Sequence, residues 1–142
     1  MKFPFLRRKQ MVQSSPYQYL FFEGKFLPIV PLGLQGENGF VKFNVFIDTG
    51  ASYSLFHASA AEVLGIQLEK GSKDEMTVGD GNTLTVYIHT VVVSIAGKEF
   101  PTRLGFSREI GVNMNILGRK DIFDKFVICF DEKEKKVTFT SK

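Results

Sequence analysis

The sequence predicts a single small all-β domain, a barrel or sandwich with one or two short helices. Three observations lead to this fold class. A chain of 142 residues is long enough to bury one hydrophobic core. Aromatic and β-branched runs dominate it, and glycine-containing turns separate these runs at short intervals. Apolar spacing typical of a helix occurs around Ala60, Ala61, Val63 and Leu64.

The first half of the chain is expected to contain a hairpin, two longer extended segments and the helix. Residues 17–35 predict a short hairpin followed by an extended segment. The sequence Gly-Glu-Asn-Gly at 36–39 indicates a turn. Residues 40–47 predict a strand that enters the core, because their alternating pattern becomes apolar on both faces. Residues 56–66 predict a short helix with Gly65 as its C-cap.

The second half of the chain is expected to contain three further hairpins and a second short helix. Residues 76–106 contain turn signals at 79–82 and 96–98, which indicate two successive hairpins. The short apolar sequence Ile-Leu-Gly at 116–118 precedes a second short helix. Two apolar segments within residues 126–140 flank a charged turn, so they are expected to close the domain as a hairpin.

The positive charge of the chain is concentrated at its start. The net charge is +3, and four basic residues lie in the first ten positions, which contain no acid: Lys2, Arg7, Arg8 and Lys9. The remainder holds 14 basic and 15 acidic residues, a balance of −1. We therefore expect a basic, flexible arm over residues 1–15 and the folded domain over residues 16–142. A nucleic-acid-binding domain usually carries its positive charge on the folded part, so we expect no nucleic-acid partner.

Other classes of function have little support in the sequence. The single cysteine, Cys129, lies in an apolar segment and is expected to be buried; it cannot form an internal disulfide. His57 and His89 have no partners at metal-ligand spacing, so no metal is expected. No apolar run reaches the roughly 18 residues of a membrane span, and the start lacks a signal-peptide core. We expect a cytoplasmic protein without a cofactor and without a membrane partner.

An acidic residue interrupts the apolar sequence at Asp48. It follows the predicted strand 40–47 and precedes Thr49 and Gly50, after which apolar residues resume. Burial of a lone carboxylate is costly, so this position requires an explanation. A glycine-centred hairpin follows about thirty residues later, and Ile-Leu-Gly at 116–118 follows about seventy residues later.

In this order and spacing, residues 26–140 resemble the retropepsin-like aspartic proteases, the single-domain relatives of retroviral proteases. The resemblance implies the small closed β-barrel-like retropepsin (acid protease) fold and an aspartic endopeptidase that cleaves peptide or protein substrates as a homodimer. It makes Asp48 the catalytic residue: two copies would form a dyad across the dimer axis, sharing one proton and activating a water. Thr49 and Gly50 would support the dyad, and Ala51 and Ser52 would contact substrate.

The resemblance also gives a role to the hairpin turn at 79–82. Gly79, Asp80 and Gly81 match the tip of a flap that opens and closes over the substrate. Two glycines permit positive φ angles at this tip, and Asp80 makes it more polar than an apolar flap.

One position departs from the family pattern. In retroviral proteases, the arginine after Ile-Leu-Gly pairs with an acid four residues after the catalytic aspartate. Here the arginine is Arg119, but the acid is replaced by Ser52. We expect Arg119 to pair instead with Asp121 or Asp124, or to belong to a different network.

Two alternatives to an active protease remain at this point. The first is a catalytically silent retropepsin-like module that dimerises and binds peptides. The second is a small basic β-barrel that binds nucleic acid, with Asp48 in a turn; the charge distribution argues against it. Cleavage of an unstructured peptide separates the first alternative from the protease, and salt-dependent affinity would support the second.

Overall fold

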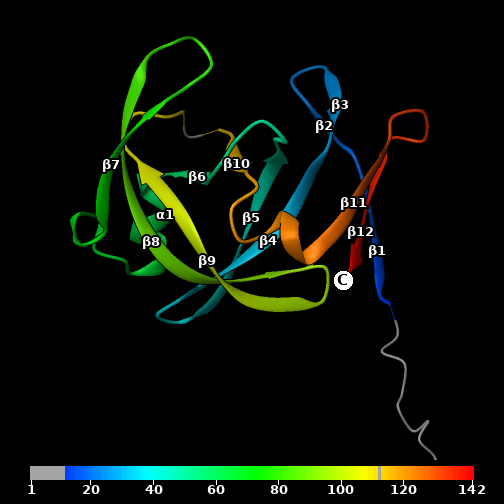
Figure 1. The fold of residues 1–142 in the computed structure, drawn as a ribbon, viewed down its shortest axis with the longest axis horizontal. Coiled ribbons are helices and arrows are strands. Elements are labelled where there is room, and N and C mark those ends of the chain that lie inside the picture. The colour runs from blue at the N-terminus through cyan, green and yellow to red at the C-terminus, as the bar shows by residue number, and fades with distance from the viewer. Residues whose placement is uncertain (1–11, 112) are drawn as a thin grey trace, which may run out of the picture.

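A computed structural model describes residues 12–111 and 113–142, and it confirms the all-β prediction (Figure 1). Its strands are β1 Ser14–Gln18, β2 Leu20–Phe22, β3 Lys25–Leu27, β4 Ile29–Gly36, β5 Gly39–Ile47, β6 Ser54–His57, β7 Ser72–Thr77, β8 Thr83–Ile95, β9 Lys98–Ser107, β10 Asn115–Leu117, β11 Phe126–Asp131 and β12 Lys136–Ser141. Three short helical segments accompany them: α1 Ala58–Leu64, and the 3-10 turns η1 Leu68–Lys70 and η2 Phe123–Lys125.

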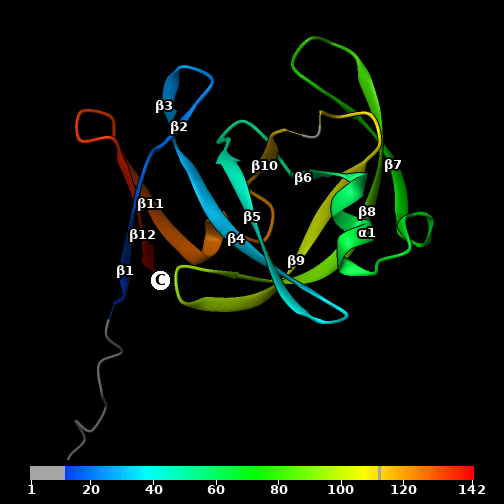
Figure 2. The same cartoon turned by 180° about the vertical axis from the view of Figure 1, so that it is seen from behind.

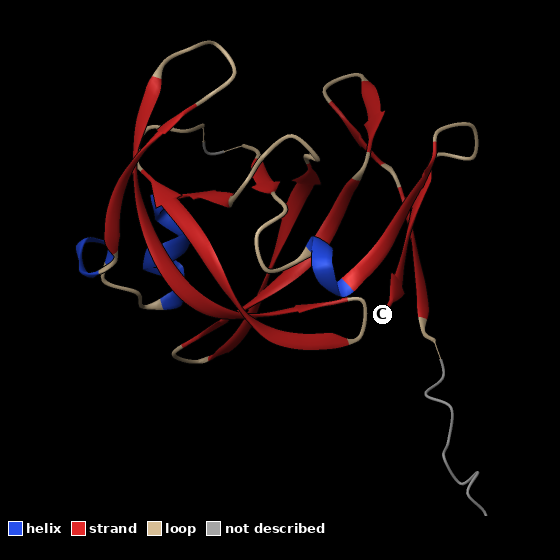
Figure 3. Cartoon of the chain, viewed as in Figure 1, coloured by secondary structure: helices blue, strands red, loops and turns tan. Residues whose placement is uncertain are grey.

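Seven strands form the main sheet, in the order β4-β5-β10-β6-β9-β8-β7. Strand β4 also pairs with β8, through Gly33 with Ser94 and Leu34 with Val93, so the sheet curls back on itself (Figure 3). Strand β10 lies between β5 and β6, parallel to the first and antiparallel to the second. This insertion places the chain segment between β5 and β6 beside the end of β10.

The first described strand and the last two strands form a separate sheet with the order β1-β12-β11. Strand β1 pairs antiparallel with β12, from Ser14 opposite Thr140 to Gln18 opposite Lys136. Strand β1 begins at Ser14, so residues 14 and 15 of the predicted arm belong to the folded domain. Residues 1–11 of that arm lie outside the described residues.

Aromatic side chains join the two sheets into one core. Phe56, Phe106 and Phe139 are fully buried. The rings of Phe56 and Phe106 lie 5.9 Å apart inside the main sheet. Phe126 of β11 lies 5.3 Å from Phe139 and 6.2 Å from Phe100 of β9, so these rings connect the terminal sheet to the main one.

Helix α1 forms where the apolar spacing predicted it. Its N-cap is His57, whose Nδ1 accepts a hydrogen bond from the Ser59 amide at 3.0 Å. Gly65 ends the helix with φ of 77°, the left-handed conformation that favours glycine, as expected. Val63 is 62% exposed, so it lies outside the buried stripe to which its spacing had assigned it.

Three details of the sequence-based prediction were wrong. Cys129 is exposed, because side chains alternate along β11 and Cys129 shares the open face of this strand with Val127, opposite Phe126 and Ile128. The second short helix, after Gly118, is only the single 3-10 turn η2. Strand β7 begins at Ser72 and not at residue 76, because its polar first residues pair with β8 although they have no apolar pattern.

Within the described ranges, no helix is long and apolar enough to cross a membrane.

A salt bridge fastens the segment after β10 to strand β9. Asp121 accepts two hydrogen bonds from the Arg103 side chain, both at 2.9 Å, and a third from the Arg103 amide at 3.0 Å. The hydrogen bond from the Arg103 side chain lowers the pKa of Asp121 to about 2. Asp121 also has φ of 64°, a conformation that asparagine tolerates.

Replacement of this carboxylate should lower stability in a pH-dependent way. We expect Asp121→Asn to reduce the free energy of unfolding by about 1 kcal/mol at neutral pH, a value that allows for the half-exposed Arg103. Because the folded-state pKa is depressed, this stabilisation is present above pH ~4 and is lost as pH falls toward about 2. Urea unfolding at several pH values measures it. Asp124→Asn, at an exposed carboxylate, is the control; an equal effect of both variants would contradict the assignment.

Candidate active site

The loop at 48–53 connects β5 to β6 and begins with Asp48. Both flanking strands pair with β10, so the loop passes over the end of this short strand. The Asp48 amide donates a hydrogen bond to the Leu117 carbonyl at 3.0 Å, which fixes the start of the loop. The Asp48 side chain is half-buried, whereas Thr49 and Gly50 are exposed. The loop therefore presents its acid at the surface of an otherwise apolar end of the sheet.

The chain after β10 fixes the rest of the loop through its backbone. The Arg119 amide donates to the Ala51 carbonyl at 3.0 Å, and the Lys120 amide donates to the Ser52 carbonyl at 2.8 Å. Backbone groups on both sides of the loop thus have defined partners, which restricts the positions that the Asp48 carboxylate can occupy.

Gly118 lies where no side chain fits. A Cβ atom there would come within 2.4 Å of the Tyr53 carbonyl oxygen, which is closer than real contacts allow. The Gly118 amide donates to the buried Ser54 hydroxyl at 2.9 Å. The Ile-Leu-Gly segment therefore passes beneath the loop. Its glycine lies in close contact with the backbone of Tyr53, and the two apolar residues come directly before this contact.

The Asp48 carboxylate itself is partly oriented by its own loop. The Gly50 amide donates to Oδ1 at 2.9 Å, and the Ala51 amide donates to the Asp48 carbonyl at 3.2 Å. Neither of these two bonds uses the second carboxylate oxygen, Oδ2.

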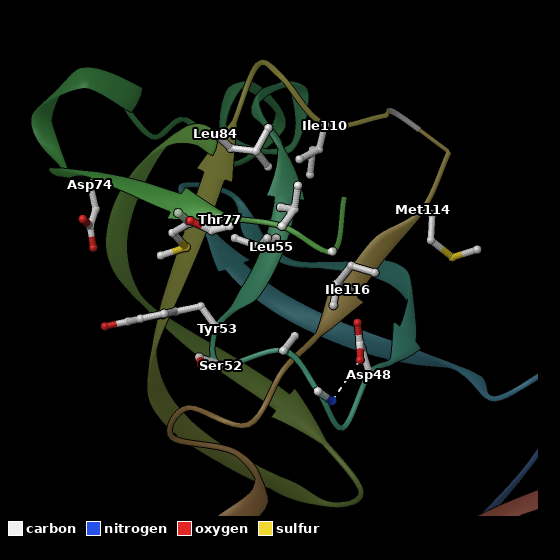
Figure 4. Close-up of a pocket in the computed structure, with 15 residues that line it drawn as sticks. Asp48, Ser52, Tyr53, Leu55, Asp74, Thr77, Leu84, Ile110, Met114 and Ile116 are labelled. Carbon is white, nitrogen blue, oxygen red and sulfur yellow. Dashed lines mark hydrogen bonds between the residues drawn. The ribbon is translucent and has the colours of Figure 1, made fainter. Parts of the chain in front are cut away.

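A cleft of about 820 Å³ opens above the loop (Figure 4). Its walls are mostly apolar and come from β6, the β7–β8 hairpin and the segment that leads into β10: Leu55, Met76, Val78, Leu84, Ile110, Met114 and Ile116. In Figure 4, Asp48 lies at one side of the cleft, while Asp74 and Tyr53 lie at the other. An extended peptide could place apolar side chains against such walls while its backbone approached Asp48.

The structure brings most of the predicted site residues to this cleft. Asp48, Gly50, Ala51 and Ser52 line it, and Gly79 lines it from the β7–β8 hairpin. Thr49, Asp80 and Gly81 are not among the lining residues.

The carboxylate of Asp80 is instead occupied within its own turn. It accepts hydrogen bonds from the amide and the side-chain nitrogen of Asn82, both at 2.9 Å. Gly81 has φ of 88°, as a tight glycine turn requires. Among the described residues, the apolar walls and Asp74 were missed by sequence reasoning, because neither spacing nor a motif marks them.

Of the two alternatives for Arg119, pairing with Asp121 or Asp124 was wrong, and the structure shows a different network. Asp121 binds Arg103, and Asp124 binds Lys125. Arg119 donates instead to the Thr49 carbonyl at 3.1 Å and to the Ser52 hydroxyl at 3.5 Å. The arginine thus still holds the loop that contains Asp48, with a carbonyl and a distant hydroxyl in place of a carboxylate.

Comparison with known proteins identifies the class that this fold and site define. A family model described as aspartyl protease matches residues 31–118, and the chain belongs to this family. The matched range contains the loop at 48–53, the β7–β8 hairpin and Gly118.

Among the described residues, no cluster of side chains could hold a metal ion.

Solved structures agree with the fold. A retropepsin-like aspartic protease from Rickettsia conorii superposes with a TM-score of 0.67 at 20% identity, covering 94% of this chain and 96% of that one. The EIAV protease, solved with the inhibitor HBY-793, gives a TM-score of 0.53 at 24% identity, covering 74% and 92% of the two chains. The chain therefore has the retropepsin-like fold. No curated protein matched it in sequence.

The close approach at Gly118 makes a testable prediction. Gly118→Ala should lower the free energy of unfolding by at least about 2 kcal/mol, because the added methyl group meets backbone atoms that cannot move alone. Urea unfolding measures the loss. Gly111→Ala is the control, since a Cβ there meets nothing within 4 Å, and its effect should stay within about 0.5 kcal/mol. Equal stability of wild type and Gly118→Ala would refute the crossing.

Proposed function

We propose that this chain is an aspartic endopeptidase that acts as a homodimer, with one Asp48 from each copy in the active site. One observation carries the proposal: the chain has a single Asp-Thr-Gly sequence, and its aspartate lies on a surface loop at the edge of a peptide-sized cleft. Two such loops must meet to provide two carboxylates.

The chemistry follows from the proximity of the two acids. Two carboxylates about 3 Å apart cannot both ionise readily, so the pair retains one proton. The ionised Asp48 takes a proton from a water while the protonated partner donates a hydrogen bond to the scissile carbonyl. The water oxygen attacks the carbonyl carbon. The proton that Asp48 took from the water then passes to the amide nitrogen, so the C–N bond breaks to give a new carboxyl and a new amine, and the pair again holds one proton.

The fixed loop supplies the orientation that this step requires. The Gly50 amide holds Oδ1 of Asp48, while Arg119 and the segment after β10 hold the loop backbone. Thr49 is exposed on the loop, where its hydroxyl could bond to the loop of the partner, as the family resemblance implies. Preorganisation of this kind lowers the barrier because the groups need not reorient during the reaction.

The β7–β8 hairpin provides the second wall of the substrate channel. Residues 76–79 line the cleft opposite Asp48, and the exposed tip at 79–82 contains two glycines. We assign this tip the role of a flap that closes over a bound peptide. The apolar cleft walls favour substrates with apolar side chains beside the scissile bond.

Removal of the ionisable group tests the catalytic role directly. Asp48→Asn should abolish cleavage of a library of unstructured peptides, because asparagine can hydrogen-bond but cannot accept the proton from water. The fold should remain nearly intact, as circular dichroism would show. Wild-type activity should follow a bell-shaped profile between about pH 3.5 and about pH 7.5, with the alkaline limb marking loss of the shared proton.

Two outcomes would contradict the proposal in different ways. If Asp48→Asn cleaves as fast as wild type, Asp48 is not the catalyst. If a confirmed wild-type dimer cleaves no peptide in the library across this pH range, the chain is a silent module that dimerises and binds peptides.

The flap assignment makes a separate prediction. A pepstatin-like inhibitor, which resembles the tetrahedral intermediate, should protect the amides of residues 78–82 from hydrogen exchange. Free protein should exchange quickly there, since the turn is held by only two backbone hydrogen bonds between Val78 and the residues at 81 and 82. The turn at 36–39, which lies outside the cleft lining, is the internal control. Unchanged hydrogen exchange at 78–82 in the inhibitor complex would contradict the assignment of this turn as a flap.

A further inference from the structure

The hairpin formed by β2 and β3, residues 20–27, stands apart from the rest of the fold. Within residues 12–111 and 113–142, its two strands pair only with each other, as a separate two-stranded sheet. Figures 1 and 2 show it rising at the same end of the molecule as the loop at 48–53 and the tip of the β7–β8 hairpin. In both views the loop lies between these two hairpins.

The strand register and the views in Figures 1 and 2 together place the β2–β3 hairpin beyond the level of Asp48. Ile29 of β4 pairs with Phe46 of β5, and the Ile47 amide donates to the Pro28 carbonyl at 3.0 Å. Strand β5 therefore ends beside Pro28, where the loop with Asp48 begins. Strand β3 continues for three further residues before the turn, a reach of roughly 10 Å past this level.

The base of this hairpin is firmly attached. Tyr19, which precedes β2, is buried, and its amide donates to the Lys135 carbonyl at 2.8 Å. Its hydroxyl donates to Glu132 Oε1 at 3.2 Å. The turn uses Glu23 and Gly24 with φ of 48° and 83°, the two-residue geometry that matches the twist of paired strands. These contacts fix the base of the hairpin to the turn between β11 and β12, and the two-residue turn holds its strands together.

Large apolar side chains cover the outside of the projection. Phe21 and Phe26 are directly opposite each other, with ring centroids 5.1 Å apart, and they are 65% and 54% exposed. Leu20 beside them is 39% exposed. Two exposed aromatic rings on a rigid projection form an apolar patch of the kind that marks an interaction site.

We propose that a second copy of this chain covers the β2–β3 hairpin. Phe21 and Phe26 of one copy then pack against the partner, next to the Asp48 loop of the partner. The inference rests on the proposed dyad. Two Asp48 carboxylates must approach to about 3 Å. An element that projects roughly 10 Å beyond them at the same end must then lie alongside the other copy. Two-fold symmetry makes this contact twice in each dimer.

A tryptophan at this position would report the contact, because the chain has none of its own. Phe21→Trp keeps an aromatic side chain at an exposed site and should fold normally. As protein concentration rises, its emission should shift to shorter wavelength over the same range in which sedimentation shows the mass doubling. Val63→Trp, at an exposed position on α1, is the matched control and should not shift. A mass that doubles without a shift at Phe21→Trp would overturn the inference.

Loss of the rings should weaken the dimer without removing the catalytic groups. Phe21→Ser with Phe26→Ser should raise the dimer dissociation constant at least about tenfold, and cleavage per chain should recover at high protein concentration. Val63→Ser should change neither quantity. An unchanged dissociation constant in the double variant would refute the role of the hairpin.

These experiments separate failure of the hairpin contact from failure of the proposed function. If wild type dimerises and cleaves peptides but the hairpin variants behave like wild type, only the hairpin inference falls. If wild type stays monomeric at every concentration and still cleaves, the dyad and the hairpin contact both fall. If wild type neither dimerises nor cleaves, the proposed function and the hairpin inference fall together.

Discussion

The insertion of β10 between β5 and β6 is the constraint on which the candidate site depends. This strand has only three residues, yet its end meets both halves of the loop at 48–53 through backbone hydrogen bonds. The crossing requires Gly118, where a side chain would strike the backbone of Tyr53. These backbone contacts set the position of Asp48, and the Arg119 side chain adds a hydrogen bond to the Thr49 carbonyl.

The proposed dyad would take one carboxylate from each copy of the chain. Asp48 lies on an exposed loop at one side of the cleft, Asp74 lines the other side, and two hairpins flank the loop at the same end. A single carboxylate can act as a base, but it cannot also donate the hydrogen bond that polarises the carbonyl. In the proposed dimer, the second copy would supply that donor, and it would also give the exposed aromatic rings of the β2–β3 hairpin an apolar contact.

Sequence patterns predicted the parts of the fold that repeat along the chain or carry a motif. The turns at 36–39, 79–82 and 96–98 were predicted because glycine between two apolar runs is typical of a turn. The pairing of Arg103 with Asp121 was not, since the partners are 18 residues apart and come from different elements. The exposure of Cys129 depends on which face of β11 stays uncovered, and the uniformly apolar segment at 126–130 does not mark that face.

Mixed dimers provide the most direct test of a site shared between two copies. Wild-type chains would be mixed with Asp48→Asn chains at a concentration at which all chains pair, and left until subunits have exchanged. A dimer with one Asp48 lacks the dyad, so an equal mixture should cleave peptide at about one half of the rate that the same amount of wild type shows alone, because partners assort at random. The rate should fall further with excess variant. A rate per wild-type chain that does not change with added Asp48→Asn would contradict a shared dyad.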